Sequence, residues 1–377
     1  MNPQSLAPTD RQLDIPPVLR YGRDRILDAA AAQWPGSTIR IRGYVPSATS
    51  CVLRIAVGNT PFVAKLSLLG VSVSSVLRGT HGAWPEVLAA QEQYESGAGH
   101  LMERQALQYG LLASAGLGDS QPVVRDGVLF TRELPGRPLG AVVAQYPART
   151  SRLLRGALRE LNILTARPEA LVLARAAGTP DATISAVFER KFGQSQRSDE
   201  LLEQAVIRLR ELAAGLDSPD VAVFGDLKPE HVLVGRDRYA FIDPALSVGS
   251  PVLDVAKLVS RLVLYLAVVP SSNPCRAMAG IDEAVAEWAR HTAPGPHGGG
   301  RLWQLVLAWA MDTANILHTV RTAPAMMPLP GHLHGLLGVD HRVVLMLDRI
   351  ARALEQNGDG GRAWATALSH TDQVLAR

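Results

Sequence analysis

The chain has 377 residues, which is enough for one large domain or two ordinary ones with a sizeable hydrophobic core. Apolar residues make up 47% of the sequence and charged residues 19%, a composition that excludes a disordered chain. The formal net charge is only +3, because 38 basic residues nearly balance 35 acidic ones. A protein that binds nucleic acid through one basic face would carry a larger excess, so we expect no nucleic-acid partner.

Cysteine usage and hydropathy indicate the compartment. The two cysteines, Cys51 and Cys275, lie far apart and suggest neither a disulfide framework nor a zinc site. The most apolar run, residues 262–269, is much shorter than the roughly 20 residues that a membrane-spanning helix needs. Residues 1–17 lack the apolar stretch of a signal peptide. We therefore expect a cytoplasmic protein with no membrane partner.

The first third of the chain shows mostly strand patterns. Residues 1–20 are expected to form a flexible tail. The following residues predict, in chain order, a helix over 23–34, strands over 38–45, 51–57 and 61–66, and helices over 85–94 and 101–115. Asp126-Gly127 separates two apolar runs, and this dipeptide favours a two-residue turn, so a β-hairpin is predicted over 122–134.

The segment Pro135-Gly136-Arg137-Pro138 marks the expected domain boundary, because helical patterns dominate after it. Helices are predicted over 149–165, 199–216, 253–268, 281–291, 303–320, 339–356 and 363–375. Strands enter this part only around its centre. The sequence thus predicts an α+β protein with a strand-rich part over 21–134 and a mainly helical part over 135–377.

The centre of the chain carries the side chains that could take part in catalysis. A strand-like run over 221–224 leads into a loop with Asp226, Lys228 and His231. Two short apolar runs around a Gly-Arg-Asp turn then predict a hairpin, which would bring Asp226 and Asp243 together across its base. Paired carboxylates beside a lysine suit metal-assisted phosphoryl transfer. The alternative is two loop aspartates that cap backbone N–H groups.

These residues also resemble a known family. Residues 224–231, with the sequence Phe-Gly-Asp-Leu-Lys-Pro-Glu-His, and Phe-Ile-Asp at 241–243 resemble the catalytic and metal-binding loops of the aminoglycoside phosphotransferase family. This family is the small-molecule branch of the protein-kinase-like fold. The resemblance continues through Gly249, Asp254 and Ala256, and upstream Val-Ala-Lys at 63–65 resembles the family's third strand.

The resemblance implies a two-lobed, kinase-like α+β fold. The smaller lobe, residues 21–134, would carry an antiparallel sheet and bind the nucleotide. The larger, mainly helical lobe, residues 135–377, would carry the catalytic loop and the acceptor site. Residues 130–139 resemble the hinge between the lobes, and we expect Arg132 and Glu133 there to contact the nucleotide.

Roles at the catalytic loop follow from the matching positions. Asp226 would orient the acceptor hydroxyl and take its proton, with Lys228 beside it, and Asp243 would chelate Mg²⁺. His231 stands where the family has a metal-binding asparagine. Imidazole is a poor Mg²⁺ ligand but a better one for Mn²⁺, so either His231 binds the metal at a weakened site, with Mn²⁺ as an alternative ion, or it only hydrogen-bonds Asp226 or a phosphate. Asp254 would brace the loop.

Roles at the nucleotide follow in the same way. Lys65 would bind the phosphates of ATP or GTP and pair with Glu103. Their separation of 103 − 65 = 38 positions is long, so Glu92 and Glu95 are rival partners. The loop over 43–50 would cover the phosphates with its backbone N–H groups, and it offers one glycine, Gly43, and the hydroxyls of Ser47 and Ser50.

The acceptor is expected to be a small molecule. Only 254 − 243 = 11 positions separate Asp243 from Asp254, which leaves no room for the segment with which protein kinases dock peptides. The resemblance therefore implies phosphorylation of a hydroxyl on an antibiotic, a sugar or another metabolite, in resistance or in biosynthesis. A nucleotide-binding regulatory module without turnover is the main alternative, and a protein-directed kinase is a more distant one.

Overall fold

The computed structural model describes residues 15–96, 101–118, 122–177, 182–192, 199–214, 216, 221–236, 238–292, 298–324, 327 and 329–375. The chain divides into two compact units. Unit 1 comprises Met1–Gly110, Asp119–Glu133 and Thr322–Pro330, and unit 2 comprises Leu111–Gly118, Leu134–Arg321 and Gly331–Arg377. The sequence predicts one continuous range for each part, but two segments belong to the other unit. Leu111–Gly118 belongs to the helical unit and Thr322–Pro330 to the strand-rich one.

A five-stranded antiparallel sheet forms the centre of unit 1. Its strands are β1 (Ile39–Tyr44), β2 (Cys51–Val57), β3 (Thr60–Leu66), β4 (Val123–Arg125) and β5 (Val128–Arg132). They follow the order β1-β2-β3-β5-β4. The predicted hairpin β4–β5 is confirmed, because Arg125 pairs with Val128 and the turn residues Asp126 and Gly127 both have positive φ, at 48° and 75°. These are the dihedrals that a type I′ turn requires.

Helices complete unit 1. They are α1 (Ile15–Gln33), α2 (Val73–Leu77), α3 (Trp84–Ser96) and α4 (Leu101–Ser114), whose last residues belong to unit 2. The tail expected over 1–20 is wrong for residues 15–20, which are helical, and residues 1–14 lie outside the described residues. Trp34, just after α1, packs its ring against Phe62 of β3 at 4.9 Å and against Phe130 of β5 at 5.0 Å. Helix α1 thus covers the sheet.

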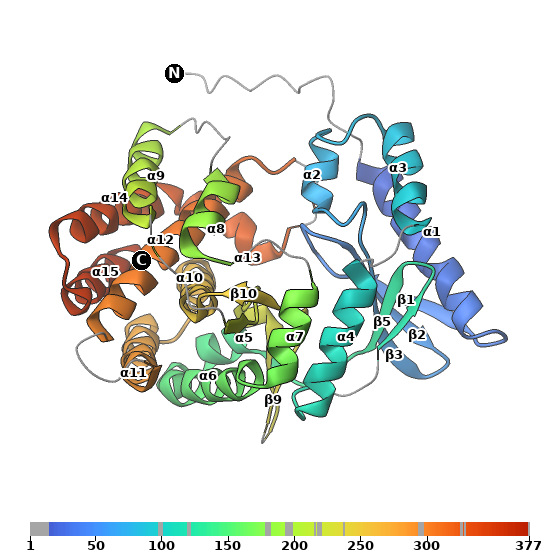
Figure 1. Cartoon of the computed structure of the whole chain (residues 1–377), viewed down its shortest axis with the longest axis horizontal. Helices are drawn as coiled ribbons and strands as arrows, with labels where there is room; N and C mark the ends of the chain where they lie inside the picture. Colours follow the sequence, from blue (N-terminus) through green and yellow to red (C-terminus); the bar gives the residue numbers. More distant parts are fainter. Residues whose placement is uncertain are drawn as a thin grey trace. The chain divides into compact units, whose positions relative to one another are not determined.

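Unit 2 is built mainly from helices (Figure 1). They are α5 (Leu139–Gln145), α6 (Thr150–Thr165), α7 (Pro168–Ala176), α8 (Ile184–Phe192), α9 (Glu200–Ala213), α10 (Pro251–Val268), α11 (Pro274–Thr292), α12 (Gly298–Arg321), α13 (Gly331–Gly335), α14 (Asp340–Gln356) and α15 (Gly360–Leu375). Helix α10 is buried nearly all round and packs against α12, whose Trp309 is fully buried. None of the helices in the described part of the chain is long and apolar enough to span a membrane.

Short strands in unit 2 position the central loop. They are β6 (Arg137–Pro138), β7 (Val221–Val223), β8 (Val232–Val234), β9 (Tyr239–Phe241) and β10 (Ser247–Gly249). β7 pairs with β10, and β6, β8 and β9 form a second small antiparallel sheet, so the predicted β8–β9 hairpin is confirmed. An antiparallel sheet in one unit and helices in the other confirm the expected α+β class.

Candidate active site

The loop after β7 has a backbone that glycine alone can supply at one position. Gly225 has φ +84°, and a Cβ there would lie 2.0 Å from the carbonyl oxygen of Ala245. The buried carboxylate of Asp254 on α10 accepts hydrogen bonds from the N–H groups of Phe224, at 2.6 Å, and Gly225, at 2.8 Å. Burial raises the pKa of Asp254 to about 6, although Lys257 and these N–H groups favour its ionised form. This bracing role matches the expectation for Asp254.

Asp226 lies between two ammonium groups. Its Oδ2 is 2.6 Å from Nζ of Lys228, and its Oδ1 is 3.0 Å from Nζ of Lys257. Burial raises the pKa of the Asp226 carboxyl, but the two lysines outweigh burial and hold the pKa well below its usual range. Asp226 is therefore a carboxylate at neutral pH, and its remaining lone pairs can accept a hydrogen bond from a hydroxyl.

Lys257 is a further residue at this loop that was not among those expected from the sequence. Its Nζ also donates to the carbonyl oxygen of Gly225 at 2.7 Å, so the side chain holds both the backbone and the carboxylate of the loop. A signal was present, because Lys257 is one of only four lysines and follows Asp254 by three positions on a predicted helix. Residues three apart on a helix share a face, so both side chains reach the same loop.

His231 and Asp243 lie beside Asp226. His231 Nδ1 is 2.8 Å from the backbone carbonyl oxygen of Asp226, which can only accept, so Nδ1 carries the proton. In the neutral ring the lone pair is then on Nε2, which lies 3.7 Å from Oδ2 of Asp243. Burial, followed by Lys228, lowers the pKa of His231, which keeps the ring neutral near pH 7. Asp243, at the exit of β9, has φ +55°.

These three side chains fit a divalent cation. One ligand atom from each of Asp226, His231 and Asp243 lies within 4.8 Å of the others. Two carboxylates and one imidazole nitrogen suit Mn²⁺ better than Mg²⁺, because Mg²⁺ prefers an all-oxygen shell. The structure thus brings Asp226, Lys228, His231 and Asp243 together, as the spacing of the sequence predicts.

The expected Lys65–Glu103 ion pair is absent. Lys65 lies on β3, paired in register with Leu129, whereas Glu103 is exposed in the first turn of α4 and no ion pair joins the two residues. The buried side of α4 carries Met102 and two glutamines, and Glu103 is offset from that side. The expectation for Glu103 is therefore wrong in this structure. Its rival Glu95 is engaged with Arg25 at 2.8 Å.

The remaining residues expected at the nucleotide also lie in unit 1, where their role stays a prediction. Gly43 follows a bulge in β1, and the Ser47 hydroxyl accepts hydrogen bonds from the N–H groups of Thr49 and Ser50, at 3.2 and 3.3 Å. The Glu133 carboxylate pairs with Arg42 and Arg54, both at 2.9 Å. Arg132 is exposed at the end of β5.

A cavity of about 250 Å³ lies next to the loop within unit 2, and both Gly225 and Lys257 line it. Asp312 of α12 is at its wall, and its two oxygens pair with Lys191 at 3.2 Å and with Arg261 at 2.9 Å. Burial lowers the pKa of Lys191 to about 8 despite this carboxylate. Arg190 also lines the cavity and has no carboxylate partner in the described part of the chain. The described lining is therefore richer in cations than in carboxylates.

Comparisons with known proteins identify the family. A family model described as the phosphotransferase enzyme family matches residues 74–297, which include the loop with Asp226 and Asp243 but not Lys65. Among curated proteins, no sequence matches. The match covers more than half of the chain.

Solved structures share the fold at low sequence identity. An aminoglycoside 2'-phosphotransferase-IIIa in complex with GDP is 16% identical with TM-score 0.50, over 87% of this chain and 98% of that one. An amicoumacin kinase in complex with AMP-PNP, Ca²⁺ and Ami is 13% identical with TM-score 0.51, over 89% of this chain and 96% of that one. A choline/ethanolamine kinase family protein from Mesorhizobium loti is 14% identical with TM-score 0.46, over 91% and 99%. The kinase-like fold and the resemblance drawn from residues 224–256 are confirmed, and the chain belongs to the phosphotransferase enzyme family.

Proposed function

We propose that this protein transfers the γ-phosphoryl group of ATP or GTP to a hydroxyl group of a small molecule. One observation carries the proposal: the Asp226 carboxylate lies between Lys228 and Lys257, and His231 and Asp243 complete a cluster within 4.8 Å. The family match, which includes this loop, supports a phosphotransferase. The two structural relatives, one with GDP and one with AMP-PNP, support the use of a nucleotide donor.

Asp226 orients the acceptor hydroxyl in this proposal. A carboxyl group whose pKa is held well below its usual range is a weak base but a good hydrogen-bond acceptor. This suits phosphoryl transfer, because the transition state is loose and positioning contributes more than early proton abstraction. Lys228 supplies positive charge next to Asp226, where the transferred phosphoryl group carries negative charge.

Asp243 and His231, together with an oxygen of Asp226, are the residues that would hold a divalent cation. A bound Mg²⁺ or Mn²⁺ would neutralise phosphate charge. His231 presents its Nε2 lone pair toward Asp243, because its Nδ1 proton is engaged with the carbonyl of Asp226. This orientation favours the ligand role of His231 over a purely structural one.

In unit 1, Lys65 and the loop with Gly43, Ser47 and Ser50 are proposed to bind the phosphates, and Arg132 and Glu133 the rest of the nucleotide. For two of the loop N–H groups, phosphate would have to replace the Ser47 hydroxyl as acceptor. Glu103 is not part of the proposal, because it is exposed and makes no ion pair with Lys65.

The cavity beside Lys257 is proposed to receive the acceptor. Lys191, Lys257 and Arg190 line it together with Asp312, whose carboxylate is already paired on both oxygens. A polycationic acceptor would meet unfavourable charge in such a cavity. The described lining therefore favours a neutral or anionic hydroxyl compound, such as a sugar or a hydroxy acid.

The test is transfer of labelled phosphate from ATP or GTP to a panel of hydroxyl compounds grouped as cationic, neutral and anionic. Asp226→Asn should lower kcat by about 10²- to 10⁴-fold and leave nucleotide affinity nearly unchanged. Asp372→Asn, which changes an exposed aspartate on α15, is the matched control and should keep full activity. Full turnover in Asp226→Asn would disprove the assignment. Nucleotide binding without any product across the panel would favour the regulatory module.

A further inference from the structure

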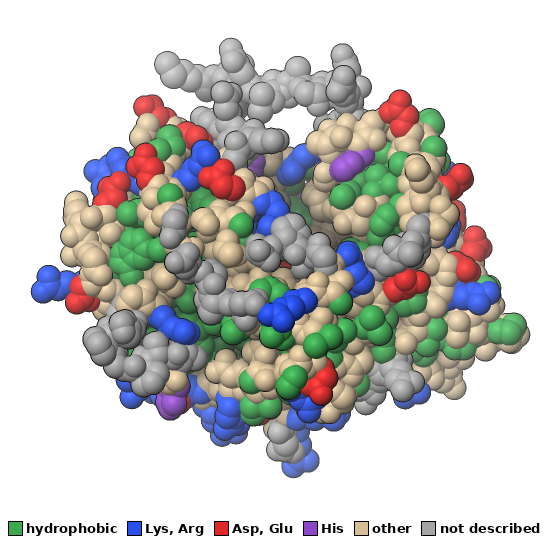
Figure 2. Space-filling view, in the orientation of Figure 1, with side chains coloured by type: hydrophobic (Ala, Val, Ile, Leu, Met, Phe, Trp, Pro, Cys, Tyr) green, Lys and Arg blue, Asp and Glu red, His purple; other side chains and the backbone are tan. Residues whose placement is uncertain are grey.

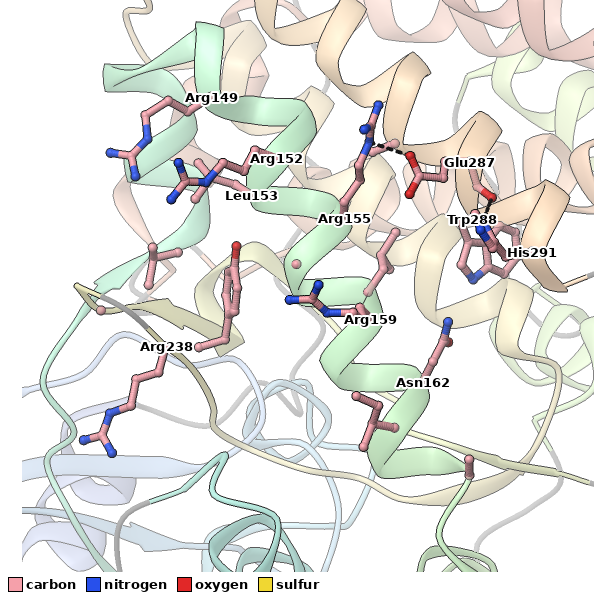
Figure 3. A pocket seen from close by; sticks show the side chains of 18 of the residues that line it. Arg149, Arg152, Leu153, Arg155, Arg159, Asn162, Arg238, Glu287, Trp288 and His291 are labelled. Carbon is pink, nitrogen blue, oxygen red and sulfur yellow. Dashed lines mark hydrogen bonds and ion pairs between the residues drawn. The ribbon is translucent and has the colours of Figure 1, made fainter.

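A second cavity of unit 2 is lined by none of the candidate active-site residues. It has a volume of about 930 Å³, and its walls come from α6, from the turn between β8 and β9 and from the second half of α11 (Figure 3). Six arginines line it, namely Arg149, Arg152, Arg155, Arg159, Arg236 and Arg238. Among the described residues of the lining, Glu287 carries the one carboxylate. Nothing in the proposed phosphotransferase activity uses this cavity.

Three of the arginines form one row along α6. Their spacing of three or four positions places Arg152, Arg155 and Arg159 on the same face of the helix, and Arg149 extends the row from the short 3-10 turn that precedes α6 (Figure 3). Like charges at this spacing destabilise a helix unless something neutralises them. The opposite face of α6 is buried and apolar, so this row is the side of the helix that is left for a partner.

Carboxylates neutralise only part of this charge. Arg155 pairs with Glu287 at 2.9 Å, and Arg159 approaches Glu160 at 3.7 Å. Arg149 lies over the ring of Tyr146 at 5.8 Å instead of pairing with an acid. Within the described ranges no carboxylate pairs with Arg149 or Arg152, nor with the two arginines of the β8–β9 turn, Arg236 and Arg238. Two separate segments thus contribute guanidinium groups to one cavity, and four of these groups have no carboxylate partner among the described residues.

Tyr239 of β9 joins the hairpin to the helix. A Cβ atom at Gly156 would lie 2.4 Å from the Tyr239 hydroxyl oxygen, so the ring packs directly on the α6 backbone. Burial raises the pKa of Tyr239, against the effect of Arg152 and its neighbours. The phenol therefore keeps its proton at neutral pH and can donate a hydrogen bond beside the arginine row.

We infer that this cavity binds a small polyanion that carries several phosphate groups. Guanidinium forks match phosphate oxygens in pairs, and four of the six arginines are without a carboxylate partner in the described part of the chain. The volume lies within the range of roughly 300–1,000 Å³ that small-molecule sites occupy. In Figure 2 basic side chains gather at the lower edge of the molecule, where Figure 1 shows α6 and β9.

The hairpin connects this site to the catalytic loop. His231 directly precedes β8 and Asp243 follows β9 by two positions, while each strand is only three residues long. A ligand that holds the turn therefore contacts the same short hairpin whose base carries the candidate metal ligands. Binding at the turn is expected to restrict the motion of this base.

The test is calorimetry with inositol hexakisphosphate as probe, in buffer without nucleotide or divalent metal. We expect a Kd on the order of 10 µM that weakens as salt concentration rises. Arg152→Glu and Arg238→Glu should each weaken binding about tenfold or more, and Arg152→Gln should do so to a smaller degree. Arg362→Glu, on the exposed side of α15, is the matched control and should bind as the wild type does.

Two further measurements distinguish this cavity from the candidate active site, and a small polyphosphate from an anionic polymer. Lys65→Ala and Asp226→Asn should leave the Kd for the probe unchanged, because both residues lie outside the cavity lining. A duplex oligonucleotide and poly-glutamate should bind more weakly than the probe. The proposal fails if the probe does not bind below about 1 mM, if the α6 and turn variants bind normally, or if either polymer binds more tightly than the probe through the same arginines.

Discussion

Replacing Asp254 by alanine removes the acceptor of two backbone N–H groups, that of Phe224, which is buried, and that of Gly225, which is partly buried. Each buried donor left without a partner costs about 1–3 kcal/mol, so loss of the bonds to Phe224 and Gly225 should lower the free energy of unfolding by about 2–6 kcal/mol. The pKa of Asp254 determines how its contribution to the free energy of unfolding depends on pH. It is about 6 in the folded state against an ordinary value of 3.8, so the stability that Asp254 contributes is fully present below pH 3.8 and declines as pH rises through 6.

Alanine does not titrate, so the difference in the free energy of unfolding between wild type and Asp254→Ala should narrow by roughly 1 kcal/mol between pH 5 and pH 8. Urea unfolding at both pH values, followed by the fluorescence of the six tryptophans, measures it. Asp254→Asn keeps one carbonyl acceptor without a charge and should lose about half as much stability at pH 5. Because asparagine does not titrate either, its difference from the wild type should narrow with pH by the same amount as that of Asp254→Ala. A loss below about 1 kcal/mol in Asp254→Ala, or a difference that does not narrow as pH rises, would refute the reasoning.

Gly225→Ala should lower the free energy of unfolding by at least about 2 kcal/mol, because it combines a left-handed φ with a Cβ 2.0 Å from a carbonyl oxygen. Gly110→Ala, in an open helical position, should not be destabilised under the same urea titration, and equal effects would contradict the strain argument. Asp312→Asn tests stability in acid. Burial raises the pKa of Asp312, but Arg261 and Lys191 outweigh burial and hold this pKa low. The contribution of Asp312 to the free energy of unfolding is therefore present above about pH 4 and is lost as the pH falls below it. Thermal melts of Asp312→Asn between pH 5 and pH 3 should show a shallower decline than those of the wild type, and a parallel decline would count against the ion pairs. His231→Asn should shift the metal preference of phosphoryl transfer from Mn²⁺ toward Mg²⁺, and an unchanged preference would show that His231 is no ligand.

Local chemistry explains which parts of the fold could be predicted. Asp126-Gly127 fixes its own turn, since few residue pairs adopt two positive φ values, and the strands on both sides follow from it. The long helices α10, α12 and α14 carry sustained apolar patterns. By contrast, α2 and α8 have five and nine residues, which is too short for periodicity to stand out.

The candidate site divides in the same way. Asp226, Lys228, His231 and Asp243 lie within one loop and one short hairpin, so their spacing alone predicts that they meet. Lys191 and Asp312 are 121 positions apart and meet only through the packing of α8 near α12, which no local pattern encodes. Glu103 and Lys65 are separated by α2 and α3, so their distance along the sequence does not predict that the Glu103 side chain is exposed.

The scarcity and burial of lysine have a practical consequence for chemical labelling. The chain has four lysines, and none of them is exposed; the side chains of Lys191, Lys228 and Lys257 are only 20%, 20% and 17% accessible. An amine-reactive ester therefore finds no exposed lysine, and any lysine that it does acylate lies beside Asp226 or Asp312, or on β3. Attachment to a sensor surface through amines would thus bias the measured affinities, whereas the exposed thiol of Cys275 offers attachment on α11.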